Sequence, residues 1–330
     1  MMGSCWTSPS RWREDAVPVM EAFYFPDVPR PTWVVRPVLA LGNFDGLHRG
    51  HLKILERVKR GAAERGGTPM AMTFEPHPPR VVRPDKAPLL LMTPDQRLEA
   101  LHRAGVAAVA VVRFTQELSA WDPETFVKTV LVDWLQVSEV WVGANFLFGH
   151  DRAGNYSLLR SLGQRWGFRA EKIDPVRYRD FVVSSTRVRR LLSEARVDEA
   201  AALLGHLYYL DGTVVEGRRR GRELGFPTAN LCTANEIIPP VGVYATTMTI
   251  DGIVHAGITN VGVRPTFGES DLTVETHVLK YTGDLYGRSV RLSFVQRLRD
   301  ERRFADVDAL RAQIEADRRS ADRVFAQLSV

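Results

Sequence analysis

Cysteine is scarce in this chain: 330 residues include only Cys5 and Cys232. Two cysteines so far apart do not make the disulfide framework of small secreted proteins, and such sparse usage is typical of a reducing cytoplasm. Long apolar runs are also missing, since no stretch approaches the roughly 20 residues that a transmembrane helix needs. The N-terminal segment lacks the apolar centre of a signal peptide. We therefore expect a cytoplasmic protein that does not associate with a membrane.

Strong excess charge is absent too, although basic residues prevail. Lys and Arg exceed Asp and Glu by 44 to 39, which gives a formal net charge of +5 and a pI near 9.3. A modestly basic protein can bind nucleic acid, but phosphate-bearing small molecules suit the same charge. Composition leaves both classes of partner open.

The sequence also lacks internal repeats and low-complexity tracts, and its length indicates two domains. Residues 1–31 are rich in Trp, Pro and Arg, show no clear period, and are expected to form an N-terminal extension. Residues 32–204 alternate apolar strands with amphipathic helices, whereas residues 205–330 consist mainly of short β-rich runs. Domain boundaries are therefore expected after residues 31 and 204.

Residues 32–204 have the pattern of an α/β sheet. Helices are expected after residue 48, after a capping box at Thr93-Pro94-Asp95-Gln96, and after Asp122-Pro123. Their alternation with strands predicts a Rossmann-like parallel sheet with ligands at the carboxyl ends of its strands. The expected strands cover residues 34–41, 69–74, 106–112 and 137–142.

Residues 205–330 predict a small β-barrel followed by a C-terminal helix. Gly, Pro, Asn and Asp separate the β-rich runs. The closing helix has Asp306 as a plausible N-cap and carries Val307, Leu310 and Ile314 on one face. The expected strands cover residues 208–215, 242–250, 253–261, 274–279 and 289–298.

The most informative segment is Gly42–His51, which reads GNFDGLHRGH directly after the apolar run Val38–Leu41. A strand that passes through a glycine-bearing turn into a helix leaves free N–H groups at the helix start, where anions bind. His48 and His51 lie at the mouth of this helix and can face phosphate oxygens. Gly50 allows the backbone to come close. The segment predicts a nucleotide site.

Two other interpretations of His48 and His51 remain open from the residues alone. They can be ordinary surface histidines, or they can bind zinc, for which their spacing is suitable. No HExxH or CxxC cluster accompanies them, which disfavours zinc.

A second glycine-rich segment, Gly217–Leu231, reads GRRRGRELGFPTANL. Gly217, Gly221 and Gly225 are evenly spaced with arginines between them, a pattern that suits a mobile basic flap over phosphates. It is not a P-loop, because GxxxxGK[ST] is absent. In isolation RRRGR favours a nucleic-acid patch, but the adjoining GFPTAN favours the flap.

These two segments belong to a larger set of motifs. In the first half the others are TFEPHP (Thr73–Pro78), VGANFLFG (Val142–Gly149) and VSSTRVR (Val183–Arg189). In the second half the others are GVRPTFG (Gly262–Gly268), VETHVL (Val274–Leu279) and DLYG (Asp284–Gly287). In order and spacing, the set resembles the bacterial bifunctional riboflavin kinase/FAD synthetases from about residue 37 to the C-terminus.

The resemblance implies two reactions: riboflavin and ATP give FMN and ADP, and FMN and ATP give FAD and pyrophosphate. The phosphate of FMN is already anionic, so adenylyl transfer needs positioning and charge neutralisation rather than a base. The resemblance implies His48, His51 and Arg189 for that role. Phosphorylation of a neutral hydroxyl needs a base, for which the resemblance implies Glu275. On an alternating strand Glu275 shares a face with His277.

Further ligand contacts follow from the resemblance. In the adenylyltransferase half they are expected at Gly42, Asn43, Phe44, Asp45, Gly50, Asn145, Ser184, Ser185 and Thr186. In the kinase half they are expected at Gly217, Gly221, Arg222, Gly225, Pro227, Thr228 and Asn230. Thr228 and Asn230 are also implied as Mg²⁺ ligands, and two neutral oxygen donors should bind the metal mainly as a nucleotide complex. Arg187 is a weaker candidate than Arg189, and His77 is left open between a structural and a ligand role.

One departure affects the kinase half. Many relatives continue E-x-H-x-x-D-F, whereas this chain has Lys280 and Tyr281 there, which removes one carboxylate near the flavin end of the site. One alternative is therefore the same fold with one half inactive, most simply the kinase. The other is a basic nucleic-acid-binding protein. The main hypothesis involves no nucleic acid and no membrane, and leaves the oligomeric state unknown.

Overall fold

The computed structural model describes residues 21–217, 226–265 and 270–328. Cys5 and the expected ligand residues Gly221, Arg222 and Gly225 lie outside these ranges, as does part of the GVRPTFG motif. The chain divides between Ser185 and Thr186 into two compact units, which are described separately.

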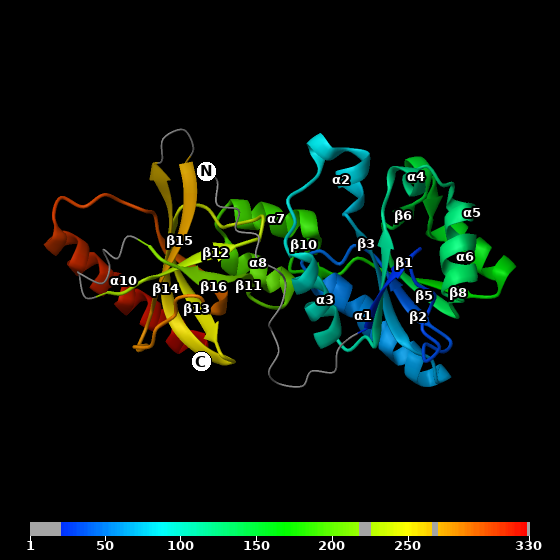
Figure 1. Ribbon diagram of the computed structural model, residues 1–330, viewed down its shortest axis with the longest axis horizontal. Helices are drawn as coiled ribbons and strands as arrows, with labels where there is room; N and C mark the ends of the chain where they lie inside the picture. Colours follow the sequence, from blue (N-terminus) through cyan, green and yellow to red (C-terminus); the bar gives the residue numbers. More distant parts are fainter. Residues whose placement is uncertain (1–20, 218–225, 266–269, 329–330) are drawn as a thin grey trace. The chain divides into compact units, whose positions relative to one another are not determined.

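The first unit contains a six-stranded sheet in the order β1-β4-β3-β2-β5-β8, in which all neighbouring strands are parallel. This confirms the predicted parallel α/β fold (Figure 1). The strands are β1 (Glu21–Phe25), β2 (Val38–Leu41), β3 (Pro69–Glu75), β4 (Ala108–Arg113), β5 (Glu139–Gly143) and β8 (Arg169–Ile173).

Apolar residues alternate between the two faces of this sheet and bury both. Leu39 and Leu41 of β2 belong to a core with Phe126, Val130 and Leu159, which come from the helices of one face. Helix α1 packs against β2, β3 and β5. The helical segments are α1 (Arg49–Arg65), α2 (Pro78–Val82), η1 (Pro84–Lys86), α3 (Pro94–Arg103), α4 (Gln116–Ser119), α5 (Pro123–Phe126), the π-helix η2 (Val127–Trp134), η3 (His150–Arg152) and α6 (Tyr156–Trp166).

The predicted helix starts are confirmed in detail. The Thr93 hydroxyl accepts from the Gln96 N–H at 3.2 Å, and the Gln96 side chain accepts from the Thr93 N–H at 2.9 Å, which completes the capping box. Asp122 caps α5 by accepting from the N–H groups of Glu124 and Thr125. Two short hairpins complete the unit, β6 (Leu147–Phe148) with β7 (Gly154–Asn155) and β9 (Arg177–Tyr178) with β10 (Phe181–Val182).

The expected N-terminal extension is wrong in part, because Glu21–Phe25 form β1 at the edge of the sheet. Phe23 is buried, and the rings of Phe23 and Phe25 lie 5.3 and 5.1 Å from that of Trp134. Apolar contact with η2 thus holds a strand in a region without a clear sequence period.

The second unit begins with two helices, α7 (Ser185–Ser193) and α8 (Val197–Leu204). The division into compact units lies at Ser185/Thr186, and the expected domain boundary at 204/205 stays a prediction. Packing accounts for this division: α8 buries Val197, Ala200 and Leu203 and contacts β11 and β16 of the barrel.

A closed six-stranded barrel follows, in the order β11-β12-β15-β14-β13-β16. The barrel and the C-terminal helix α10 (Val307–Leu328) confirm the predicted fold, and Asp306 caps α10 by accepting from the Ala309 N–H at 2.7 Å. The prediction missed β12, without which the barrel would not close. The strands are β11 (Tyr208–Val215), β12 (Ala229–Thr233), β13 (Gly242–Ile250), β14 (Ile253–Pro265), β15 (Ser270–Val278) and β16 (Ser289–Arg299).

The barrel interior contains a chain of three threonine hydroxyls among apolar side chains. Thr246 and Thr259 lie 2.7 Å apart, Thr259 and Thr276 lie 2.8 Å apart, and none of the three is exposed. A buried hydroxyl without a partner is costly, so Thr259 satisfies one hydroxyl on each side. On the outside, Ala321 and Phe325 of α10 pack against Val243, Ala245, Ile258 and Leu279.

Replacing the central hydroxyl should destabilise the barrel. We expect Thr259→Val to lower its free energy of unfolding by about 1–3 kcal/mol, because Thr246 and Thr276 lose their shared partner. Urea unfolding monitored by far-UV circular dichroism tests this, with Thr213→Val on an exposed position of β11 as the control. All five tryptophans among the described residues lie in the first unit, so far-UV circular dichroism rather than tryptophan fluorescence is the suitable probe of the barrel. Equal transitions for the two variants would contradict the role of Thr259.

Candidate functional site

The sheet of the first unit has its switch point between β2 and β5. The chain proceeds from β2 through β3 to β4 on one side and from β5 to β8 on the other. In such sheets, ligands bind beyond the carboxyl ends of the two strands at this point. Gly42 directly follows β2, and Asn145 lies two residues after β5 with its side chain exposed. Two predicted ligand residues therefore emerge at the expected edge.

The loop between β2 and α1 is a tight, buried turn. Phe44, Gly46 and Leu47 have φ of +53°, +83° and +37°, the left-handed region that is uncommon for residues other than glycine. The Phe44 ring is completely buried and lies against Gly42, where an added Cβ would be 3.4 Å from the ring. The Asn43 carbonyl accepts from the Thr73 hydroxyl at 3.2 Å. The buried Phe44 ring and the hydrogen bond from Thr73 of β3 thus hold the turn in place.

Asp45 fastens this loop to a distant segment. One carboxylate oxygen accepts from the N–H groups of Leu91 and Met92 at 2.9 and 3.1 Å, and the other from Leu91 at 3.1 Å. The Asp45 carbonyl accepts from the Ser185 hydroxyl at 2.8 Å, which joins the two predicted phosphate motifs. The side chains of Phe44 and Asp45 therefore hold the loop in shape, and their expected contacts with ligand stay a prediction.

His48 and His51 lie together at the start of α1. Their rings stack at 3.7 Å with 12° between the planes. His48 is the N-cap, and its Nδ1 accepts from the His51 N–H at 3.3 Å, so in the neutral ring the proton lies on Nε2. An added Cβ at Gly50 would lie 3.1 Å from the His48 ring. Gly50 therefore makes room for this imidazole.

The electrostatic state of His51 follows from its surroundings. Burial, and then the neighbouring His48, lower the pKa of His51 well below its ordinary value of 6.5. Its Nδ1 is enclosed and has no hydrogen-bond partner among the described residues. His51 is thus a neutral imidazole, which can give a phosphate oxygen an N–H donor.

The zinc interpretation is not supported by this geometry. Stacked imidazoles direct their nitrogens alongside one another rather than at one ion, and Nδ1 of His48 is already an acceptor. In the described ranges, no group of three or more His, Cys, Asp or Glu side chains lies close enough to hold a metal.

The lowered pKa of His51 predicts a loss of stability in acid. Below about pH 6.5 the unfolded chain takes up a proton that folded His51 resists, so stability present above that pH is lost as pH falls. His51→Gln should remove up to about 1.4 kcal/mol per pH unit of this dependence. Tryptophan-monitored unfolding between pH 5 and 7.5 measures it, with the exposed His150→Gln as the control. An unchanged pH slope in His51→Gln would contradict the prediction.

The other candidates of the first motifs divide between the two units. Ser184 and Ser185 are half-buried at the end of the first unit. Thr186 is exposed, and Arg189 is half-buried on α7 in the second unit. Phe146 stacks on Phe148 at 5.4 Å, and Phe148 belongs to the core. His77, whose role was left open between structure and ligand binding, is buried at the residue that precedes α2.

In the barrel, three polar side chains are aligned across neighbouring strands. Glu275 of β15 is paired in register with Asn230 of β12 on one side and with Asn260 of β14 on the other. Glu275 and His277 are half-buried, whereas Val274 and Thr276, which alternate with them along the strand, are buried. This confirms the predicted face of Glu275. The structure adds Asn260, which the alternation of β14 would have indicated had its partner strands been known.

The segment around Thr228 lies beside this row. The Pro227 carbonyl lies 2.9 Å from His277 Nδ1, and the Phe226 ring meets the His277 ring edge-on at 5.6 Å. Thr228 is half-buried. An added Cβ at Gly217 would lie 2.2 Å from Asn230 Nδ2, so glycine is required there by close approach. Gly217 and Pro227, which belong to the described parts of the glycine-rich segment, therefore lie next to the strands that carry Asn230 and Glu275.

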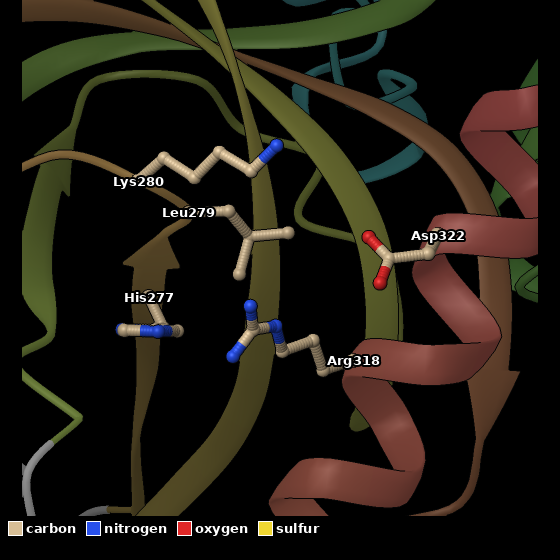
Figure 2. A pocket seen from close by; sticks show the side chains of 5 residues that line it. All are labelled: His277, Leu279, Lys280, Arg318 and Asp322. Atoms are coloured by element: carbon tan, nitrogen blue, oxygen red, sulfur yellow. The ribbon is translucent and has the colours of Figure 1, made fainter.

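A cavity of about 420 Å³ lies farther along the same strand, within the size range of small-molecule sites. Its walls come from the end of β15 and from α10, with Lys280 and Arg318 supplying cations and Asp322 a carboxylate (Figure 2). His277 and Leu279 complete the lining. His277 lies two residues after Glu275 on the same face.

Comparison with known proteins agrees with both halves. The family model described as FAD synthetase matches residues 34–187, and the one described as riboflavin kinase matches residues 204–325. The bifunctional riboflavin kinase/FMN adenylyltransferase of Pseudomonas fluorescens is 40% identical over 85% of this chain and 90% of its own. The chain belongs to this bifunctional family.

Further relatives agree. The Escherichia coli (strain K12) enzyme of the same name is 36% identical over 87% of this chain and 92% of its own. A crystal structure from Streptococcus pneumoniae, named a macrolide-efflux protein, has a TM-score of 0.83 at 26% identity and covers 92% of this chain and 99% of that one. Efflux is said of that protein, and the likeness here concerns the two-domain fold. In the described part of this family member, no helix is both long and apolar enough to cross a membrane.

Proposed function

We infer that this chain phosphorylates riboflavin with ATP to FMN and then adenylylates FMN with ATP to FAD and pyrophosphate. The observation that carries the inference is the agreement of two independent family matches with two different sites on one chain. Each match falls on the half whose side chains suit its reaction. The bifunctional relatives cover most of this chain's length.

For adenylyl transfer, we propose that the start of α1 binds the ATP phosphates. Its free N–H groups, together with the N–H groups of His48 and His51, would stabilise charge that develops as pyrophosphate leaves. A phosphate oxygen of FMN attacks the α-phosphorus, so no base is needed. The lowered pKa of His51 supports a donor role. Arg189 and the Ser184–Thr186 segment would add donors, and Asn145 would contact a base or flavin edge.

For phosphorylation, we propose Glu275 as the base. It would accept the proton of a riboflavin hydroxyl as the oxygen attacks the γ-phosphorus of ATP and ADP leaves. Asn230 and Asn260 flank it in register and can orient the hydroxyl or the carboxylate. Gly217 and Pro227 would contact the nucleotide, whereas the expected contacts Gly221, Arg222 and Gly225 lie outside the described ranges and stay predictions.

Thr228 and Asn230 fit a magnesium ion held mainly through ATP. Both offer neutral oxygen atoms, and Asn230 is paired in register with Glu275. Together they form a hard donor set of the kind Mg²⁺ prefers. When bound, the ion would neutralise charge on the phosphates. These residues would contribute orientation, because the close approach of Gly217 fixes the Asn230 amide.

We propose that riboflavin occupies the cavity beyond His277. Leu279 gives its wall an apolar part, and the charged groups suit the polar edge of a flavin (Figure 2). Lys280 replaces a carboxylate expected from the family, yet Asp322 supplies one to the same cavity from α10. This favours an active kinase over the one-half-inactive alternative. We further propose cytoplasmic location and no nucleic-acid or membrane partner, with FMN and ATP as the other small-molecule substrates.

Product analysis tests the proposed function directly. The pure protein incubated with riboflavin, ATP and Mg²⁺ should produce FMN first and FAD later, resolved by chromatography with time. FAD formed solely when FMN is supplied would indicate an inactive kinase. Tight, salt-sensitive RNA or DNA binding without flavin products would favour the nucleic-acid alternative.

Two substitutions should separate the reactions. His51→Ala should lower FAD formation from FMN by about 100-fold or more because it removes a donor to the phosphates, while FMN formation stays within twofold. Glu275→Ala should lower FMN formation by about 10²–10⁴-fold and leave FAD formation from supplied FMN intact. Glu275→Gln and His150→Ala serve as matched controls for shape and for histidine loss. Loss of both activities in either folded variant would contradict this division.

A further inference from the structure

Arg49 stands out in the loop that begins α1. Every residue from Phe44 to Gly50 is buried except Arg49, which is exposed at the first position of the helix. The first turn of α1 contains no acidic side chain. A cation at the first position of a helix opposes the helix dipole, whereas an anion bound there would be attracted by both the dipole and the cation.

The Arg49 side chain extends to the hairpin of β9 and β10. Its guanidinium carbon lies 5.7 Å from the centroid of the Tyr178 ring. The guanidinium carbon of Arg179 lies 5.6 Å from the same centroid. Both distances fall within the range of cation–π attraction. One half-buried tyrosine therefore holds two guanidinium groups that come from separate elements of the same unit.

The hairpin keeps Arg179 in an unfavourable backbone conformation. Arg179 has φ of +51°, which costs free energy for a side chain of this size. The Arg177 guanidinium donates to the Asp180 carbonyl at 3.0 Å and so ties the turn together. Among the described residues, Arg179 forms no ion pair. This backbone conformation of Arg179 places a second guanidinium group next to the Tyr178 ring.

The hairpin is fastened to the nucleotide loop. β10 ends at Val182, and three residues later the Ser185 hydroxyl donates to the Asp45 carbonyl at 2.8 Å. The two arginines are therefore joined to the loop of His48 both through the chain of α1 and through this hydrogen bond. Their separation from the histidines is fixed by short, structured segments.

We propose that Tyr178 holds Arg49 and Arg179 as a paired clamp for the β- and γ-phosphates of ATP, which leave as pyrophosphate. This rests on the proposed adenylyltransferase function. In the reaction, an oxygen of FMN bonds to the α-phosphorus while the bond from that phosphorus to the bridging oxygen breaks, and its electron pair leaves with pyrophosphate. Two guanidinium groups match the several oxygens of this polyanion. Tyr178 acts as a positioning residue.

The reverse reaction isolates this clamp. Pyrophosphate and FAD give ATP and FMN, and pyrophosphate is not a substrate of the kinase half. Arg49→Ala and Arg179→Ala should each raise the KM for pyrophosphate about 10-fold and leave the KM for FAD within twofold. Arg160→Ala, which removes an exposed arginine from α6 of the same unit, should leave both unchanged.

Substitutions of Tyr178 test positioning against simple structure. Tyr178→Leu should raise the KM for pyrophosphate, whereas Tyr178→Phe, which keeps the ring, should stay near the wild type. In the Arg49→Ala/Arg179→Ala background, Tyr178→Leu should add no further change. Urea unfolding of each variant, monitored by the fluorescence of tryptophans in the same unit, verifies that the first unit is folded.

The outcomes distinguish this inference from the function on which it rests. If the wild type interconverts FMN and FAD but the arginine variants behave like Arg160→Ala, the clamp is overturned. Equal effects of Tyr178→Leu and Tyr178→Phe would overturn the role of the ring. If the wild type converts neither FMN to FAD nor FAD to FMN, the adenylyltransferase function itself fails.

Discussion

The site of the first unit depends on the buried carboxylate of Asp45. By accepting from the N–H groups of Leu91 and Met92, it fixes a loop with three residues at positive φ. Hydrogen bonds to an ionised group contribute roughly 1.5–3 kcal/mol each, enough to offset the strain of such a turn. The backbone of the same residue accepts from Ser185. One acidic residue thus connects the strand–helix loop, the segment before α3 and the serine motif.

In the kinase half, regular strand pairing rather than a special loop fixes the positions of the candidate site residues. Alternation places Glu275 outside and Thr276 inside, and register places Asn230 and Asn260 beside Glu275. No special loop conformation is needed, because the closed barrel fixes the row on all sides. If Glu275 is the base, as we propose, this rigidity would help it to meet the riboflavin hydroxyl. The adenylyltransferase half, which needs donors rather than a base, can instead rely on a helix start.

The sequence predicted the features that depend on local patterns. The capping box at Thr93, the N-caps Asp122 and Asp306, and the strands Tyr208–Val215 and Gly242–Ile250 all agree with the structure. Features that depend on distant contacts were missed. β1 is held by Trp134, more than 100 residues away. The role of Asp45 is set by an N–H group 46 residues away. β12 overlaps the end of the GFPTANL motif, and its strand conformation depends on pairing with β11 and β15 rather than on a local pattern.

Burial also explains how the first unit distributes its charge. An imidazole enclosed in the loop is costly to protonate, so the pKa of His51 is lowered and the ring acts as a neutral donor. A full positive charge carries little desolvation penalty at the surface, where Arg49 and Arg179 are exposed. Placing both on the Tyr178 ring keeps them near the helix start without desolvating them. In the proposed adenylyl transfer, neutral donors in the loop would face the reacting phosphorus of ATP, and the exposed cations would face the phosphates that leave.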